Sequence, residues 1–270
     1  MEILRKSRKK LRSVMVVSTT ISLVFAGLAC QGSAPSDRMA IDRGDAKAAA
    51  DRLAEADELY EGREDLNKAR VCVAALRQAR TADYGNYEAA WKLARAAFYV
   101  GDRSPNNSEK DDMFREGVQA GKAAVALQPD KPEGHFWLGA NYGGEASQST
   151  LANLSSVQDI KNEMETVLKI DESYEGHSAY LGLGRLYLQA PKVLGGDTAK
   201  AIQYLEKGVK LSPNNTMMRF HLAEAYVEAN RDAEAKKQIE TIMKTTPDPK
   251  YTAEHTDAVA KAQKLLQKIG

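Results

Sequence analysis

Residues 129–142 read PDKPEGHFWLGANY, and this stretch determines how the rest of the chain is interpreted. Pro129 closes one helical segment, because proline lacks the backbone N–H that a helix interior requires. Leu138 and Tyr142 then follow one helical turn apart, so that their side chains share a face, and the small Gly139 next to Leu138 leaves room for a neighbouring helix. The stretch therefore predicts a seam between two packed helical hairpins.

The same spacing recurs along the chain. Residues 201–213, AIQYLEKGVKLSP, repeat the pattern that ends in a proline, and Leu222 and Tyr226 follow at the distances seen after Pro129. Further copies are Leu183, Gly184 and Tyr187, then Ala235, Ile239, Ile242 and Pro247, and finally Gly117, Gly121, Ala124 and Pro129. This pattern resembles the tetratricopeptide repeat (TPR), in which units of about 34 residues must stack to bury their apolar faces.

The predicted fold is therefore an all-α, right-handed, TPR-like solenoid of about four to five helical hairpins. A C-terminal helix near residues 252–269 should cap it, with one polar face and one apolar face. The expected water-facing residues are Glu254, Asp257, Lys261 and Lys264. The expected sealing residues are Val259, Ala262, Leu265 and Leu266.

The N-terminus predicts a secretory leader. Six basic residues precede an apolar run at residues 14–26, which is short and interrupted by Ser and Thr. The following FAGLAC resembles a bacterial lipobox, in which Cys30 would be lipidated, although Gly27 stands where Leu is usual. An ordinary signal peptide with an incidental cysteine remains the alternative. Gln31 would favour sorting to the outer membrane.

This leader defines the expected organisation of the chain. Residues 1–29 form a lipoprotein signal peptide, residues 30–44 a flexible tether, and residues 45–270 the solenoid. The protein should then lie in the periplasm, anchored by lipid to the outer membrane.

Composition and motifs argue against several other functions. From residue 30 onward the chain has 32 Lys and Arg against 36 Asp and Glu, and no basic stripe predicts nucleic-acid binding. The four histidines lack metal-ligand spacing, and the glycine-rich segments lack the residues of a phosphate-binding loop. We therefore expect no enzyme, no metal and no cofactor. Cys72, within VCVAAL, should be a small buried residue.

Three connectors between the helices of a hairpin are expected to be long: residues 101–110, 143–156 and 189–200. Equivalent connectors of a solenoid fall on the same edge. They are candidates for recognition loops, because a rigid scaffold often carries recognition there. Tolerated surface insertions would produce the same pattern.

Several segments resemble a known family. ADELYEGRED, YEAAWKLARAAFYVGD, EGHFWLGANYGGEAS and PKVLGGDTAKAIQYLEKG are similar to the T-component lipoproteins of tripartite ATP-independent periplasmic (TRAP) transporters. The same helices and the tail AEHTDAVAKAQKLLQKI also resemble the regulator of microtubule dynamics proteins. The resemblance spans about residues 50–269. It implies a periplasmic lipoprotein that engages the solute-binding subunit of a transporter, with Cys30 at the lipidation position, and it carries over no catalytic residue.

The concave groove of a TPR solenoid supplies candidate binding residues. Four positions of each first helix face this groove, and here they include aromatic rings and cations that suit a peptide or a small organic acid. The candidate site residues are Lys92, Tyr99, Phe136, Arg185, Phe220 and Glu224. Ordinary packing between repeats, with solvated charges, is the alternative for each of them.

Two functional classes follow. The first is a non-catalytic accessory lipoprotein that binds a TRAP solute-binding protein, with a small organic acid or a second copy of the chain as further candidate partners. The second is a general TPR scaffold that organises envelope proteins without binding small molecules. Neighbouring genes for a solute-binding protein and a TRAP permease would favour the first class.

Overall fold

The computed structural model describes residues 45–148 and 154–270, and the structural statements below apply to these residues. They form eleven α-helices and two short 3-10 helices, and no strand occurs among them. The elements in chain order are α1 (Ala46–Glu61), α2 (Leu66–Ala82), α3 (Tyr87–Arg103), α4 (Asn107–Leu127), α5 (Pro132–Gln148), α6 (Leu154–Ile170), α7 (Tyr174–Gln189), η1 (Lys192–Leu194), α8 (Thr198–Leu211), α9 (Thr216–Glu228), α10 (Asp232–Lys244), η2 (Pro249–Tyr251) and α11 (Thr252–Ile269). The predicted leader, the tether and Cys30 lie outside the described residues.

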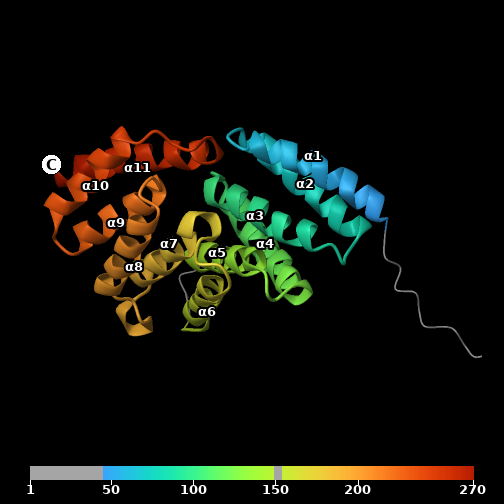
Figure 1. Ribbon diagram of the computed structural model, residues 1–270, viewed down its shortest axis with the longest axis horizontal. Helices are drawn as coiled ribbons and strands as arrows, with labels where there is room; N and C mark the ends of the chain where they lie inside the picture. The colour runs from blue at the N-terminus through green and yellow to red at the C-terminus, as the bar shows by residue number, and fades with distance from the viewer. Residues whose placement is uncertain (1–44, 149–153) are drawn as a thin grey trace, which may run out of the picture. The chain divides into compact units, whose positions relative to one another are not determined.

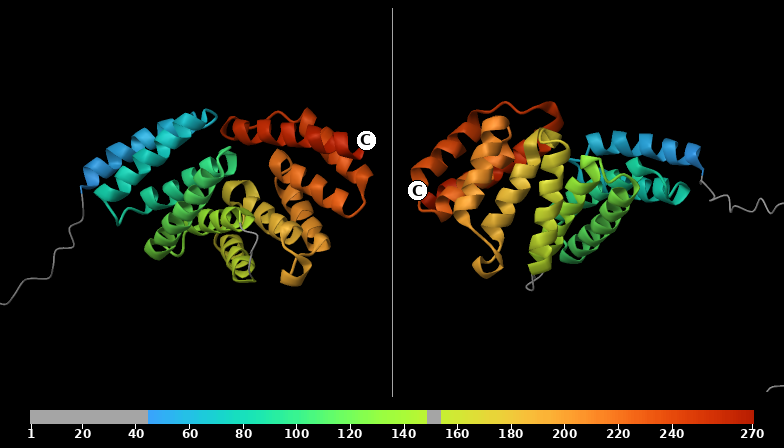
Figure 2. Two further views of the ribbon diagram at one scale, coloured as in Figure 1. Left: turned by 180° about the vertical axis from the view of Figure 1, so that it is seen from behind. Right: turned by 60° about the horizontal axis from the view of Figure 1, so that its bottom comes forward.

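The helices pair into five hairpins, each an odd-numbered helix packed on the next even-numbered one, and α11 follows as a final single helix. The odd-numbered helices also pack on one another from repeat to repeat, so they form the inner layer of the solenoid and the even-numbered helices the outer layer. Figure 1 and Figure 2 show the hairpins following one another round an arc. The predicted all-α, TPR-like solenoid with five hairpins is confirmed.

Short polar residues set the start of most helices. In six cases an Asp or Asn side chain accepts a hydrogen bond from a backbone N–H of the first turn, which satisfies a donor that the helix itself leaves free. These N-cap residues are Asp45, Asp65, Asn86, Asn106, Asp197 and Asn215. The starts of these six helices therefore follow from local sequence.

The seam around residues 129–142 packs as its sequence predicts. Leu138 is buried on α5, and a Cβ atom added at Gly139 would lie 2.8 Å from Cε of Met164 on α6. Because real Cβ atoms do not approach other atoms this closely, a side chain at position 139 would force Met164 to shift.

Two of the three predicted long connectors are shorter than expected. Between α3 and α4 only residues 104–106 connect the helices, so the prediction of a loop over residues 101–110 is wrong. The second connector was predicted at residues 143–156. There α5 continues to Gln148 and α6 begins at Leu154, so only residues 149–153, outside the described part, separate the helices. The glycines that suggested loops instead make room for a ring: a Cβ at Gly101 or Gly144 would lie 2.8 or 2.3 Å from the ring of Phe114.

The third connector is confirmed as long. Residues 190–197 join α7 to α8 and include η1 (Lys192–Leu194). A hydrogen bond from the N–H of Asp197 to the carbonyl of Tyr187, at 2.8 Å, closes the connector at its base. Its tip exposes Val193, which is 91% accessible.

The C-terminal helix α11 begins and ends where the sequence predicts, but the residues that face water differ from those predicted. Ala262 and Ala258 are buried, and Val259 and Leu265 pack partly against the same cluster, whereas Leu266 is 38% exposed. Two of the four residues expected to face water form ion pairs instead: Glu254 with Arg63, in the turn after α1, and Asp257 with Arg103, at the end of α3. None of the described helices has the length and apolar character needed to span a bilayer.

Candidate functional site

The inner layer holds the six predicted groove residues, beginning with Lys92 on α3. Its Nζ atom lies 2.8 Å from Oδ2 of Asp57 on α1 and 3.5 Å from Oε2 of Glu88, and its side chain is only 11% exposed. The hydrocarbon stem is therefore packed and the charge is compensated within the chain. Lys92 joins the first two hairpins in this structure.

Tyr99 lies further along α3 and is buried. Its ring packs edge-on against Tyr60 of α1, with ring centroids 6.0 Å apart. The guanidinium groups of Arg103 and Arg63 lie 3.9 and 5.7 Å from the centre of the Tyr99 ring. Tyr99 is thus surrounded by cations, which its electron-rich face attracts.

Phe136 is part of an aromatic group on the middle repeats. Its ring packs edge-on against Trp137 at 4.9 Å and against Tyr174 at 5.4 Å. The indole N–H of Trp137 donates a hydrogen bond of 3.2 Å to the hydroxyl of Tyr174. Because Phe136 is only 9% exposed, its ring is mainly a packing element between α5 and α7.

The remaining three predicted residues gather around His221 on α9. Nδ1 of His221 lies 2.6 Å from a carboxylate oxygen of Glu224, and the ring packs edge-on against Phe220 at 5.0 Å. Burial lowers the pKa of His221 to about 4; the hydrogen bond with Glu224 opposes this shift, and the nearby charge of Arg185 adds to it. The structure therefore brings Arg185, Phe220 and Glu224 together.

The six residues thus form three local groups and not one continuous wall. Lys92 and Tyr99 belong to the first two hairpins, Phe136 to the middle, and the others to the repeats that follow. Their role in binding stays a prediction.

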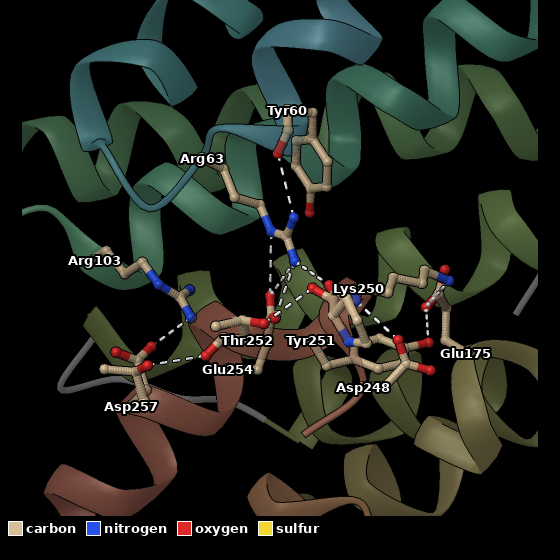
Figure 3. A network of polar contacts seen from close by, with 12 residues as sticks. Tyr60, Arg63, Arg103, Glu175, Asp248, Lys250, Tyr251, Thr252, Glu254 and Asp257 are labelled. Atoms are coloured by element: carbon tan, nitrogen blue, oxygen red, sulfur yellow. Dashed lines mark hydrogen bonds and ion pairs between the residues drawn. The ribbon is translucent and has the colours of Figure 1, made fainter. Parts of the chain in front are cut away.

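Sequence reasoning missed a set of contacts that links the C-terminal segment to the first two hairpins and to α7, which we call the closure network. Figure 3 shows it: Arg63, in the turn after α1, donates hydrogen bonds to Glu254 of α11 and, at 2.7 Å, to the backbone carbonyl of Lys250. Arg103 binds Asp257 at 2.5 Å. Ala253 also packs in the same apolar cluster as Tyr99. The C-terminal helix therefore closes back on the start of the described chain.

Glu175 on α7 completes the closure network. Its carboxylate accepts hydrogen bonds from Lys250 Nζ at 3.0 Å and from the hydroxyl of Tyr251 at 2.8 Å (Figure 3).

Glu175, Gly176 and His177 all have left-handed backbones, with φ of 46°, 62° and 64°. This conformation costs about 1–2 kcal/mol for each residue other than glycine, so surrounding contacts must hold it. Gly176 within an otherwise helical segment was the one sequence signal for this kink.

Two arginines of the inner layer retain hydrogen-bonding capacity. The Arg95 guanidinium lies 3.7 Å from the centre of the Tyr60 ring, and its buried Nε has no hydrogen-bond partner among the described residues. Arg185 Nε is likewise buried without a partner in the described part of the chain. Arg95 also lies 4.0 Å from a carboxylate oxygen of Asp57, so its charge is partly compensated within the chain.

Comparison with known proteins agrees with this architecture. The family model for "Regulator of microtubule dynamics protein 1-3" matches residues 52–190, and a tetratricopeptide repeat model matches residues 194–253. No curated protein sequence matches the chain.

Solved structures show the same fold. TTC0263, a thermophilic TPR protein of Thermus thermophilus, superposes with a TM-score of 0.62 at 18% identity, covering 81% of this chain and 99% of its own. PilF of Pseudomonas aeruginosa superposes with a TM-score of 0.51 at 15% identity, covering 82% of this chain and 91% of its own.

Proposed function

Because this chain belongs to the regulator of microtubule dynamics protein 1-3 family, whose model covers just over half of it, we propose that it is a non-catalytic protein that binds a protein partner through the inner layer of its solenoid. A TPR-like scaffold supports a role in protein interaction, since stacked repeats present an extended concave surface. The leader predicted at residues 1–29 supports a role in the bacterial envelope.

One observation carries the proposal: Arg185 has a buried guanidinium N–H with no acceptor among the described residues, and its charge acts on His221, which contacts Phe220 and Glu224. Buried donors in folded proteins are nearly always hydrogen-bonded, so this one favours an acceptor from outside the chain. A carboxylate of a partner would supply it. Phe220 is only 6% exposed and belongs to the buried apolar cluster, so it supports the site from within the chain. Arg95, on the earlier repeats, offers a second donor of the same kind.

The finer proposal concerns the partner and the location. The resemblance to T-component lipoproteins supports a role as an accessory of a TRAP solute-binding protein, with the chain anchored at the periplasmic side of the outer membrane through Cys30. An organic acid carried by that solute-binding protein would be a second source of carboxylate. The alternative is a scaffold for other envelope proteins that does not contact small molecules.

Calorimetry of the mature chain against a purified TRAP solute-binding protein from the same organism tests the proposal. Arg185→Ala should weaken binding about tenfold or more, because a charge-assisted hydrogen bond contributes about 1.5–3 kcal/mol. Arg115→Ala is the matched control, since that side chain is 60% exposed on α4. Circular dichroism should show equal helicity for all three proteins.

Two outcomes would count against this function. Equal affinity of the wild type and Arg185→Ala would exclude the inner layer around His221 as the binding surface. Absence of any binding to the solute-binding protein would favour the general scaffold.

A further inference from the structure

The seam at residues 129–142 contains a histidine whose two ring nitrogens both face acceptors. Nδ1 of His135, on α5, lies 2.6 Å from a carboxylate oxygen of Glu163 on α6. Nε2 of the same ring lies 2.8 Å from the backbone carbonyl oxygen of Pro129, in the turn between α4 and α5. His135 therefore joins three successive parts of the solenoid: this turn, α5 and α6.

These contacts fix the number of protons on the ring. A carbonyl oxygen cannot donate a hydrogen bond, so Nε2 must carry a proton to bind Pro129. The hydrogen bond at Nδ1 then requires a second proton, which lies between the ring and the carboxylate. A carboxyl group is ordinarily the stronger acid, with a pKa of about 4.3 against about 6.5 for imidazolium, so this proton belongs to the ring. The geometry is therefore that of an imidazolium bound to a carboxylate.

The ion pair is largely removed from solvent. The side chains of His135 and Glu163 are only 11% and 20% exposed. The hydrogen bond to Glu163 raises the pKa of His135, and the Pro129 carbonyl adds to this effect, whereas burial opposes it; the pKa is raised on balance. The contacts of the ring thus outweigh the cost of burying its charge.

Glu163 is the charged group that acts on the ring. The other charged side chains of the turn and of the start of α5 face solvent or have another partner: Asp130 and Lys131 are exposed, and Glu133 accepts a hydrogen bond from the hydroxyl of Tyr87. On α4, Lys122 lies over the ring of Tyr142. The charge on His135 therefore depends on its contact with Glu163.

Loss of one proton must break one of the two contacts. A neutral imidazole has one N–H, so it can bind Glu163 or Pro129 but not both. The other nitrogen then presents a lone pair to an oxygen, and a buried acceptor left without a donor costs stability. Because a carboxylate accepts a stronger hydrogen bond than a carbonyl, the remaining proton stays with Glu163 and the turn at Pro129 is released.

This turn borders a cavity of about 510 Å³ between the α2–α3 and α4–α5 turns. Gln128 and Lys131 of the turn line the cavity, together with Trp91 of α3. Within the turn, the N–H of Lys131 donates to the carbonyl of Gln128 at 3.3 Å, whereas the contact of His135 with Pro129 is 2.8 Å. Loss of the shorter contact leaves the turn free to move and to change the shape of the cavity.

We propose that His135 is a pH-sensitive lock on the seam between the second and third hairpins. Its imidazolium form holds the α4–α5 turn near neutral pH, and loss of one proton in alkaline solution frees the turn. Because folding raises the pKa of His135, its contribution to stability is complete below the ordinary value of about 6.5 and is lost as the pH rises through the higher value of the folded protein. The lock requires no partner, so it stands apart from the function proposed above.

NMR of the ¹⁵N-labelled histidine rings in the full chain tests the charge state. The chain has four histidines, and His135→Gln assigns the signals of this ring by their absence. At pH 7 both ring nitrogens of His135 should have the chemical shift of a protonated nitrogen. A ring with one protonated and one bare nitrogen at pH 7 would overturn the proposal.

Two variants of α6 test the role of the carboxylate. Glu163→Gln should lower the pKa of His135, because it removes the negative charge that holds the second proton. At pH 7 hydrogen–deuterium exchange over residues 128–134 should then be faster by about tenfold or more, since the charge-assisted hydrogen bond to Pro129 is lost. Glu165→Gln is the matched control: it removes the same charge from the same helix, and its side chain is 36% exposed beside Lys161.

Exchange in the wild type tests the pH response directly. After correction for the intrinsic rate, residues 128–134 should exchange faster as the pH is raised from 6 to 9, and His135→Gln should not show this change because it cannot titrate. Equal exchange in Glu163→Gln and Glu165→Gln would overturn the proposal, as would the same pH response in the wild type and His135→Gln. The wild-type measurements do not depend on the folding of the Glu163 variant.

Discussion

The guanidinium of Arg63 binds the carboxylate of Glu254, 191 residues later in the chain, with 3.0 Å between Nη2 and Oε2. The two side chains are only 11% and 29% exposed, and the guanidinium also lies 4.8 Å from the centre of the Tyr60 ring. This pair joins the turn after α1 to the first turn of α11. It is one of several contacts by which the C-terminal segment closes on the first two hairpins, and no single repeat contains it.

Removing that contact should destabilise the fold. Arg63→Ala deletes hydrogen bonds to a carboxylate and to a carbonyl, so we expect a loss of about 2–3 kcal/mol in the free energy of unfolding. Urea denaturation followed by circular dichroism measures it. Arg52→Ala is the control, because Arg52 is 48% exposed and pairs only with Glu55 of its own helix. Similar stability for both variants would mean that the closure network is not important to the fold.

The apolar face of α11 can be tested at one position. Ala262 has no exposed surface and belongs to the cluster formed with α9 and α10. Ala262→Glu should cost about 3 kcal/mol or more, because it places a carboxylate where no solvent reaches. Thermal melting and size-exclusion chromatography provide the readout. Lys264→Glu, at an exposed position of the same helix, should melt like the wild type; if Ala262→Glu does so too, α11 does not cap the solenoid.

A buried asparagine explains one glycine of α4. A Cβ atom at Gly117 would lie 2.0 Å from Oδ1 of Asn141, whose amide donates to the carbonyls of Ala94 and Trp137. Gly117→Ala must displace this side chain and should cost about 1–3 kcal/mol. Gly143→Ala, in open space on α5, should be neutral or stabilise by up to about 1 kcal/mol. Chemical denaturation measures the unfolding free energy of both variants. An equal change for Gly117→Ala and Gly143→Ala would contradict the close packing of Gly117 on Asn141.

Stability should fall in mild acid through His221. Burial lowers its pKa to about 4, below the value of about 6.5 expected in the unfolded chain, while Glu224 opposes and Arg185 and Lys261 reinforce the shift. The unfolded state therefore binds the proton more readily, so this contribution is complete above pH 6.5 and is lost as the pH falls towards 4. The expected loss is about 2 kcal/mol by pH 5.

Comparison with His221→Gln isolates this effect, because the variant cannot titrate there. The difference in unfolding free energy between the two proteins should shrink or reverse between pH 7 and pH 5. His135 acts in the opposite sense: its hydrogen bond to Glu163 raises its pKa, so its contribution is lost as the pH rises. A constant difference across this range would show that His221 is not held neutral by burial.

Anchoring through Cys30 is an independent prediction. If Cys30 is acylated, the mature protein should fractionate with membranes and resist salt extraction, since each buried CH₂ contributes about 0.8 kcal/mol. Cys30→Ala should abolish labelling by a fatty-acid analogue and leave the protein soluble. Wild-type protein found wholly in the soluble periplasmic fraction would contradict the lipid anchor.

The inner-layer residues show where prediction from the sequence stops. Counting positions within a repeat identified Arg185, Phe220 and Glu224, which the structure does bring together. The same counting also selected Lys92 and Tyr99, whose side chains are engaged by Asp57 and Tyr60 of the preceding hairpin. Repeat position specifies which face a side chain occupies, but it does not specify what the next repeat places against it.

The sequence by itself determined the helical repeats and their pairing into hairpins, although it predicted loops at residues 101–110 and 143–156 where helices partly continue. The reason is that these features depend on local spacing: an Asp or Asn before a helix, a small residue at a crossing, or the next apolar face within one repeat. Only the tertiary structure decided how the solenoid closes. The contacts of Arg63 with Glu254 and of Arg103 with Asp257 depend on the summed curvature of five hairpins and on the left-handed kink at Glu175, and no short stretch of sequence encodes that sum.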